Sequence, residues 1–176
     1  MAFQLQQWSE ALREPFADMQ SDPEVMADLG GPFDRTDSGI KFDRYRDAWE
    51  FDRISRWAVV DLAGNFLGYA GVMKAGSHDH PLGPHYEIGW RFRREVWGLG
   101  FATESARQAL QHAWTVLTTN EIFSYTAQDN KRSQAVMARI NLKRDSAEDF
   151  TAQYPRGKWS GLVWVAERPL AGSAIS

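Results

Sequence analysis

The chain has 176 residues, a length that fits one domain with a full hydrophobic core. Twenty Lys and Arg against 23 Asp and Glu give a net charge of -3, which lacks the basic excess of a nucleic-acid-binding protein. The sequence has no Cys, so disulfides, thiolate zinc sites and a cysteine nucleophile are excluded. The first residues lack the pattern of a secretion signal, and no run approaches the ~20 apolar residues that span a bilayer. We therefore expect one cytoplasmic domain over residues 1–176, without a nucleic-acid or membrane partner.

The first third of the chain is predicted to be mostly helical. A short alternating pattern over residues 3–7 indicates a weak strand, and Ser9 then stands where a helix N-cap would. A second short helix is expected between Asp22 and the glycines at 30 and 31. A longer helix is expected over about 36–52, because apolar residues recur there roughly at the helical period: Ile40, Phe42, Tyr45, Trp49 and Phe51.

From Trp57 onward, strands and helices are mixed. Residues 57–61 and 66–72 form a predicted hairpin around a glycine-containing turn, and residues 77–84 form a polar loop. The remaining pattern predicts strands over 86–93, 122–126, 143–150 and 159–166, with helices over 102–117 and 132–140. This order predicts an α/β or α+β protein, in which helices cover both faces of a sheet.

The most informative stretch joins the strand that ends near Arg93 to the helix that follows. It passes through Gly98 and Gly100, which permit a close backbone approach and let successive N–H groups point one way. The first turn of a helix adds free N–H donors and a partial positive charge, so this turn suits a pyrophosphate. The alternative is that the two glycines only make a tight turn. Neither a Walker loop nor the three-glycine dinucleotide fingerprint is present.

Two spaced motifs carry a family resemblance. Residues 87–92 (Glu-Ile-Gly-Trp-Arg-Phe) and 97–106 (Trp-Gly-Leu-Gly-Phe-Ala-Thr-Glu-Ser-Ala) resemble the acetyl-CoA motif of the GNAT N-acetyltransferases, and residues 125–137 resemble the second motif. The similarity is greatest to the branch of the ribosomal-protein N-terminal acetyltransferases RimJ and RimL. The resemblance implies a mostly antiparallel mixed sheet with helices on both faces and a splayed strand pair at the acetyl-CoA site. It also implies N-acetyltransferase activity with acetyl-CoA as cosubstrate and no metal.

The resemblance also implies which residues bind the cofactor. The backbone of residues 91–93 would pair with the pantetheine amides, the turn over 97–103 would hold the pyrophosphate, and Asn130 would bond the pantetheine region. The side chains of Arg91 and Arg93 either contact CoA phosphates or lie in solvent, and Asn130 could equally form an Asx turn into its helix. The cofactor residues are therefore Arg91, Phe92, Arg93, Trp97, Gly98, Leu99, Gly100, Phe101, Ala102, Thr103 and Asn130.

Glu87 is the candidate general base. An amine arrives protonated and only its neutral form attacks a thioester, so a group must accept its proton. By the resemblance, Glu87 takes this role, and strand alternation places it opposite Ile88, toward the cleft. The competing interpretation is a structural, salt-bridged carboxylate. A backbone N–H near Arg91 would stabilise the tetrahedral intermediate.

Ser133 and, more weakly, Tyr125 are the candidate donors to the departing thiolate. Many family members use a tyrosine where this chain has Met137, which cannot donate a proton. Ser133 could instead only bond the backbone at its helix start. Asn141 stands where the family has a glycine, and Asn is the next-best residue for a left-handed helix end.

Other features leave the acceptor open. The histidines of the polar loop and its edge, His78, His80 and His85, lack the partners of a metal site and favour a flexible substrate-side loop. Trp49, Phe51 and Trp57 either line an acceptor pocket or, as favoured here, pack in the core. The partner is an amine, either a protein N-terminus or a small molecule. A CoA-binding sensor or assembly module without turnover, a longer acyl donor and a homodimer remain alternatives.

Overall fold

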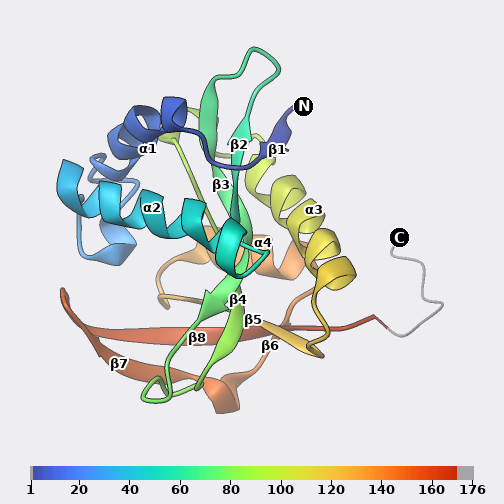
Figure 1. The fold of residues 1–176 in the computed structure, drawn as a ribbon. Coiled ribbons are helices and arrows are strands. Elements are labelled where there is room, and N and C mark those ends of the chain that lie inside the picture. The colour runs from blue at the N-terminus through green and yellow to red at the C-terminus, as the bar shows by residue number, and fades with distance from the viewer. Residues whose placement is uncertain (1, 170–176) are drawn as a thin grey trace.

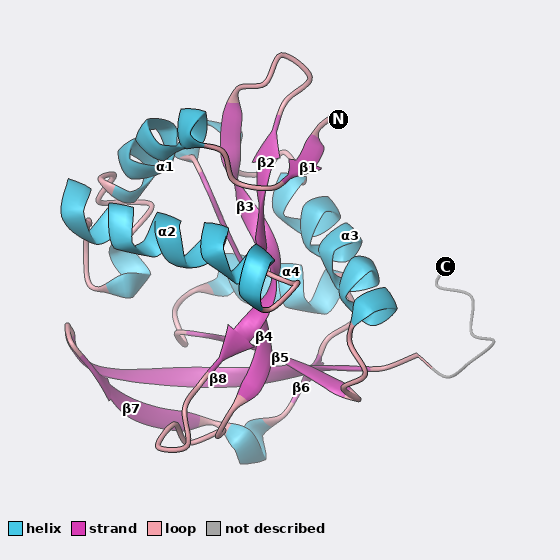
Figure 2. Ribbon diagram, in the orientation of Figure 1, coloured by secondary structure: helices cyan, strands magenta, loops and turns pink. Residues whose placement is uncertain are grey.

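An eight-stranded sheet forms the centre of the protein (Figures 1 and 2). The computed structural model describes residues 2–169. The strand order is β1-β2-β3-β4-β5-β8-β6, β7 pairs with β8 off this path, and the one parallel pair in the described chain is β4–β5. The strands are β1 (Gln4–Gln6), β2 (Arg56–Val60), β3 (Phe66–Ala75), β4 (His85–Phe92), β5 (Glu121–Thr126), β6 (Lys143–Arg144), β7 (Phe150–Tyr154) and β8 (Gly157–Glu167).

Helices cover both faces of this sheet, as the sequence predicts. Helices α1 (Arg13–Gln20) and α2 (Arg35–Phe51) pack on one face of β2 and β3. Helices α3 (Phe101–Val116) and α4 (Lys131–Arg139) cover the other face, over β4 and β5. Within residues 2–169, no helix is long and apolar enough to cross a membrane.

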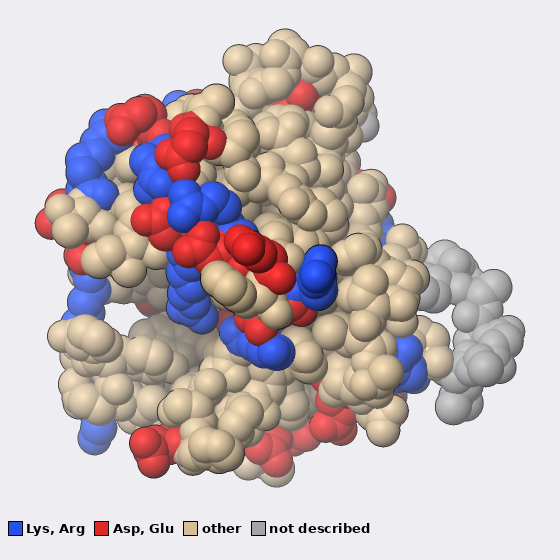
Figure 3. Space-filling view, in the orientation of Figure 1, with Lys and Arg blue, Asp and Glu red and all other residues tan. Residues whose placement is uncertain are grey.

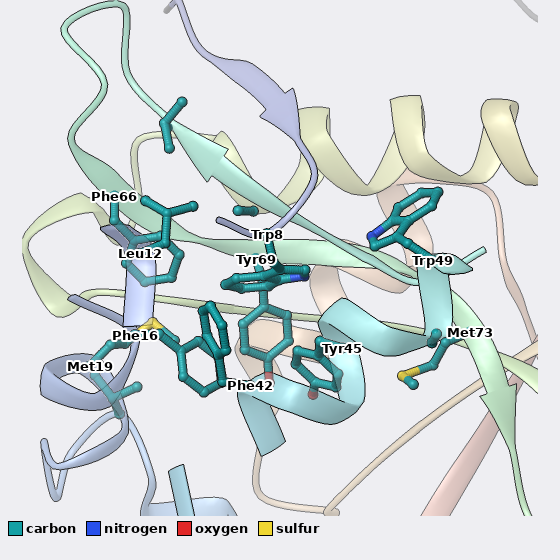
Figure 4. Close-up of a cluster of buried hydrophobic side chains, with 14 of the residues drawn as sticks. Trp8, Leu12, Phe16, Met19, Phe42, Tyr45, Trp49, Phe66, Tyr69 and Met73 are labelled. Atoms are coloured by element: carbon teal, nitrogen blue, oxygen red, sulfur yellow. The ribbon is translucent and has the colours of Figure 1, made fainter. Parts of the chain in front are cut away.

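A cluster of aromatic rings fixes α1 and α2 to the sheet (Figure 4). The ring of Trp8 lies 5.2 Å from that of Phe16 and 5.4 Å from that of Phe42, both in edge-to-face geometry. Its indole N–H donates to the carbonyl of Arg56 at 2.8 Å. Since the first residue of β2 is bonded in this way, the cluster also positions the Arg56 side chain beneath the site described below.

Strands β4 and β5 diverge, which confirms the expected splayed pair. Their ladder has the single register pair Glu87–Phe123, and the Ser124 hydroxyl donates to the Ile88 carbonyl at 2.8 Å where they part. Beyond that point, residues 89–92 of β4 have no partner strand on the β5 side within the described chain. Apart from the Phe92 carbonyl, which accepts from the Trp97 indole N–H at 2.9 Å, the backbone groups on that edge are therefore free to bond a ligand.

Two local expectations are wrong, and the expected N-cap position of Ser9 is confirmed. The predicted strand over 143–150 is interrupted, because the Asp145 carboxylate accepts from the Ala147 N–H at 3.1 Å and turns the chain into the 3-10 helix Ser146–Glu148. Asp22 similarly accepts from the N–H of Glu24 at 2.8 Å, so turns replace most of the second helix and only a 3-10 segment, Ala27–Leu29, remains. The Ser9 side chain makes no capping hydrogen bond.

The apolar pattern of α2 is only partly a buried face. Phe42, Tyr45 and Trp49 are buried, whereas Ile40 is 65% exposed and Phe51 is 77% exposed. Phe51 therefore packs in no core, contrary to the expectation, while Trp57 packs against the aromatic cluster from β2. The expected left-handed residue after α4 is confirmed, since Asn141 has a φ of 63°.

Candidate active site

A cleft of about 1020 Å³ opens where β4 ends, between the turn into α3 and the start of α4. Its walls come from the free edge of β4, the first turn of α3, the first turn of α4 and the loop that precedes α2. Because β4 and β5 part here, the cleft reaches the exposed backbone of the central sheet.

The glycine turn presents donors to this cleft. Gly98 and Gly100 have φ values of 76° and 87°, in the region that only glycine adopts without strain. The first helical bond of α3 runs from the Glu104 N–H to the Gly100 carbonyl at 3.1 Å. The N–H groups of residues 101–103 precede that bond, so they lack a helical acceptor and sit at the positive end of the helix dipole. The turn can therefore bind an anion.

Asp28 joins three elements at the opposite wall. Its carboxylate accepts from the Arg91 guanidinium at 2.8 and 3.1 Å and from the Asn130 side-chain amide at 3.2 Å. Arg91 also donates to the Val25 carbonyl. Burial opposes charge on Arg91, but Tyr69 and Asp28 outweigh it and raise its pKa. The guanidinium is thus held against Asp28 and the Val25 carbonyl in the cleft wall.

The start of α4 is capped and lies in the cleft wall. The Asn130 side-chain oxygen accepts from the Ser133 N–H at 3.1 Å, three residues on, so Asn130 caps α4 and the expected two-residue Asx turn is replaced by this N-cap bond. Ser133 itself lines the cleft, next to the basic residues Lys131 and Arg132. The Arg132 guanidinium lies 3.7 Å from the ring centroid of Trp97, which places it over the glycine turn.

Glu87 lies beyond the cleft lining and is ion-paired. Its carboxylate contacts the buried Arg56 guanidinium at 2.7 Å, and Arg56 also donates to the Glu87 carbonyl at 2.7 Å. Burial lowers the pKa of Arg56, but the Glu87 carboxylate and the nearby tyrosine hydroxyls together outweigh it, and the pKa is raised overall. Gly89 leaves room for the pair, because a Cβ there would lie 2.9 Å from the Arg56 guanidinium and 3.2 Å from a Glu87 oxygen.

Tyr125 also lies outside the cleft. Its hydroxyl is 3.3 Å from Nε2 of His85, and its ring packs on Phe150 at 5.2 Å. Burial and the nearby Glu87 charge raise the pKa of Tyr125, so it stays protonated. The loop histidines pack rather than gather around a cation site, and residues 2–169 contain no group of three metal-binding side chains.

The structure thus separates the sequence-predicted residues into two sets. The cleft lining includes Arg91, Phe92, Trp97, Gly98, Gly100, Phe101, Ala102, Thr103, Asn130 and Ser133, whereas Glu87, Tyr125, Arg93 and Leu99 lie outside it. Sequence reasoning missed Asp28, because its partners lie 63 and 102 residues away. It also missed the basic side chains of α4 at the cleft, although Lys131 and Arg132 directly follow Asn130 in the second motif.

Comparison with known proteins agrees with this geometry. A family model described as "Acetyltransferase (GNAT) domain" matches residues 3–143. A curated relative, the FsC-acetyl coenzyme A-N(2)-transacetylase of Aspergillus fumigatus, is 29% identical over 149 residues, which cover 81% of this chain. The chain spans 62% of that relative's length and 51% of a second curated relative's, from Bacillus subtilis.

Solved structures show the same fold. An acetyltransferase from Agrobacterium tumefaciens superposes with a TM-score of 0.78 at 23% identity, covering 94% of this chain and 90% of that one. A ribosomal-protein-S5-alanine acetyltransferase from Vibrio fischeri superposes with a TM-score of 0.73 at 11% identity, covering 96% and 94%. With the family model spanning most of its length, this chain belongs to the GNAT acetyltransferase superfamily.

Proposed function

We propose that the chain transfers an acetyl group from acetyl-CoA to a primary amine. The observation that carries this is the row of free N–H groups after Gly100, which faces a cleft bordered by an unpaired strand edge. A diphosphate would accept from those N–H groups, and the pantetheine amides would pair with residues 91–93 of β4. Lys131, Arg132 and Arg139 line the cleft and supply positive charge for the remaining phosphate.

In the proposed reaction the neutral amine nitrogen attacks the thioester carbonyl carbon. The C–N bond forms and the C–S bond breaks, with its electron pair leaving on sulfur as a thiolate. The amine proton passes to Glu87, directly or through water, and Ser133 donates a proton to the thiolate. A backbone N–H near Arg91 stabilises the oxyanion. Tyr125 is less suited to protonate the thiolate, because it lies outside the cleft.

Within this activity, we propose a primary amine, such as an α-amino group, as the acceptor. The name of the Aspergillus relative describes transfer to a nitrogen, and the Vibrio fischeri protein is named for an alanine of a ribosomal protein. Both names support an α-amino or other primary amine as acceptor and acetyl as the donor group. We also propose that the chain belongs to the RimJ/RimL-like branch, because Trp97 occupies the leading position of its first motif.

Gly100→Glu tests the cofactor cleft against a matched control. Gly100 and Gly64 share a φ of 87°, so Glu costs similar backbone strain at both, but Gly64 lies in the β2–β3 turn with nothing within 4 Å of an added Cβ. We expect CoA affinity, measured by calorimetry, to fall at least 100-fold in Gly100→Glu and to stay unchanged in Gly64→Glu. Equal affinities would overturn the cleft assignment. Tight CoA binding by the wild type with no CoA release on any amine would favour a sensor over an enzyme.

A further inference from the structure

Glu87 pairs in register with Met73 of β3, so its side chain lies on the sheet face that α1 and α2 cover, and it does not line the cofactor cleft. Figure 3 shows the surface hollowed between α2 and the β7–β8 hairpin, on the side of the sheet where α2 packs. The tip of the hairpin closes one end, because Arg156 donates to the carbonyls of Gly31 and Pro32 and pairs with Asp37 at 3.3 Å. An acceptor that approaches Glu87 from this side must enter between these elements.

Hydroxyl and imidazole groups surround Glu87 in this region. The Tyr125 hydroxyl lies 3.3 Å from His85, and the Tyr154 hydroxyl lies 3.3 Å from His80. Burial is the main cause that raises the pKa of both tyrosines, and the Glu87 carboxylate adds to it in each case. Side chains from β4, β5, β7 and the loop before β4 therefore lie close enough to Glu87 for its carboxylate charge to act on them.

Arg44 brings a free positive charge to the same region. It is an exposed residue of α2 and lies three positions after Lys41, so both side chains project from the same side of the helix. It makes no ion pair within the described residues. The two carboxylates beside this wall are already neutralised, Glu87 by Arg56 and Asp37 by Arg156.

Lys41, one turn before Arg44, adds further donors. Its ammonium donates to the Gln20 side-chain oxygen at 3.1 Å and lies 5.2 Å from the Phe33 ring. Burial lowers the pKa of Lys41, and no carboxylate pairs with its ammonium within the described residues. The amide nitrogen of the fully buried Gln20 has no partner within the described residues.

Of the two tyrosines behind Lys41, Tyr69 responds to this positive charge, whereas burial raises the pKa of Tyr45. Figure 4 shows the hydroxyls of Tyr45 and Tyr69 pointing the same way, out of the aromatic cluster. Burial raises the pKa of Tyr69, but the charges of Lys41 and Arg91 lower it to about 8. The α2 side of the hollow therefore offers hydrogen-bond donors and positive charge. The nearest carboxylates, those of Glu87 and Asp37, are already ion-paired.

We infer that the acceptor is an amine that also carries a carboxylate, such as a free amino acid, with its carboxylate toward Arg44 and Lys41 and its amine toward Glu87. This inference rests on the proposed acetyl transfer. The whole-chain charge of -3 would suit a cationic amine, but the local charge of the wall decides what enters. A polyamine would meet two uncompensated cations and a carboxylate already paired with Arg56, whereas a carboxylate gains charge-assisted hydrogen bonds.

The test compares acceptors that differ by one charge. L-phenylalanine, L-alanine and L-glutamate are each assayed beside their α-carboxamides and beside spermidine, with CoA release as the readout. The variants are Arg44→Gln and, as a matched control, Arg46→Gln, which removes an arginine of the same helix that pairs with Glu10 and Asp47. Binding of the N-acetyl amino acids to the CoA complex is measured by calorimetry, because these ligands cannot react.

We expect at least one amino acid to be used at least tenfold better, in kcat/KM, than its carboxamide and than spermidine. Arg44→Gln should lower that preference at least fivefold without changing CoA affinity, and Arg46→Gln should leave it unchanged. A carboxamide or spermidine preferred over every amino acid overturns the inference, as does an Arg44→Gln variant with the wild-type preference. Failure of every amino acid to react, together with failure of every N-acetyl amino acid to bind, also overturns it. Loss of CoA binding itself would instead refute the proposed function.

Discussion

At the residue scale, the Arg56–Glu87 pair serves both structure and the proposed chemistry. Arg56 is almost fully buried and its guanidinium binds the carboxylate and carbonyl of Glu87 together with the Gly71 carbonyl. A buried cation held by this many acceptors fixes its partner's position. Glu87 can therefore serve both as the partner of Arg56 and as the proposed general base, since a base must be held in place to act.

Replacing Glu87 separates these two roles. In Glu87→Gln we expect kcat to fall about 100- to 10 000-fold, because the amide cannot accept the amine proton. CoA affinity should stay at the wild-type value, because Glu87 does not line the cofactor cleft. Glu121→Gln, on the exposed start of β5, is the control. Wild-type turnover in Glu87→Gln would place the base elsewhere, and a thermal unfolding curve shows how much of any loss is due to instability.

The sequence predicts which residues form this site better than it predicts their ion-pair partners elsewhere in the chain. The glycine turn and the Asn130 cap depend on local spacing, so they can be read from consecutive residues. The pairing of Arg56 with Glu87 spans 31 positions and that of Arg91 with Asp28 spans 63, and no local pattern encodes either. The sequence therefore left open whether each arginine side chain faces solvent or phosphate, and tertiary packing decides it.

At the element scale, α2 carries a residue poorly suited to a helix. Gly39 lies inside α2, and an added Cβ would come no closer than 3.7 Å to another atom, the Arg13 guanidinium, which is ordinary contact. We expect Gly39→Ala to raise the free energy of unfolding by about 0.5–1 kcal/mol, because glycine costs more backbone entropy in a helix. Urea titration measures this change. Gly71→Ala provides the contrast, because its Cβ would lie 2.6 Å from the Arg56 backbone and should destabilise the fold.

Whether a segment forms a helix or a strand was easier to predict than whether that helix or strand runs without interruption. The helices α3 and α4 follow the apolar period closely and α2 follows it in part, while the hairpin β2–β3 follows its turn residues. The chain between Lys143 and Phe150 satisfies a strand pattern, yet the capping by Asp145 breaks it. Side-chain hydrogen bonds from Asp to the next backbone N–H groups compete with a strand, and composition alone does not show which prevails.

At the scale of the whole molecule, a partly buried histidine links stability to pH. His112 of α3 lies 5.2 Å from the ring of Trp57 and 6.1 Å from that of Trp49, and its Nε2 has no partner within the described residues. Burial lowers its pKa, so the folded protein holds it neutral at a pH where the unfolded chain already binds the proton. This contribution to stability is present above about pH 6.5 and is lost as the pH falls through the lowered value.

We therefore expect the free energy of unfolding to fall between about pH 7 and pH 5, and His112→Gln to reduce that fall. Denaturant titrations at several pH values provide the measurement. His80, whose pKa burial also lowers, accounts for part of the remaining slope. The exposed His78 serves as the control, and His78→Gln should leave the slope unchanged. An unaltered slope in His112→Gln would show that this histidine does not control acid stability.

The parting of β4 from β5 has a kinetic consequence for the proposed reaction. The cofactor cleft does not reach Glu87, whose side chain lies on the sheet face that α2 covers, and the gap after the Glu87–Phe123 pair is where the two reactants can meet. Both reactants would then occupy the protein at once, with no acylated enzyme between them. Initial rates measured against each reactant at several fixed concentrations of the other should give intersecting double-reciprocal lines, whereas parallel lines would indicate a covalent ping-pong route.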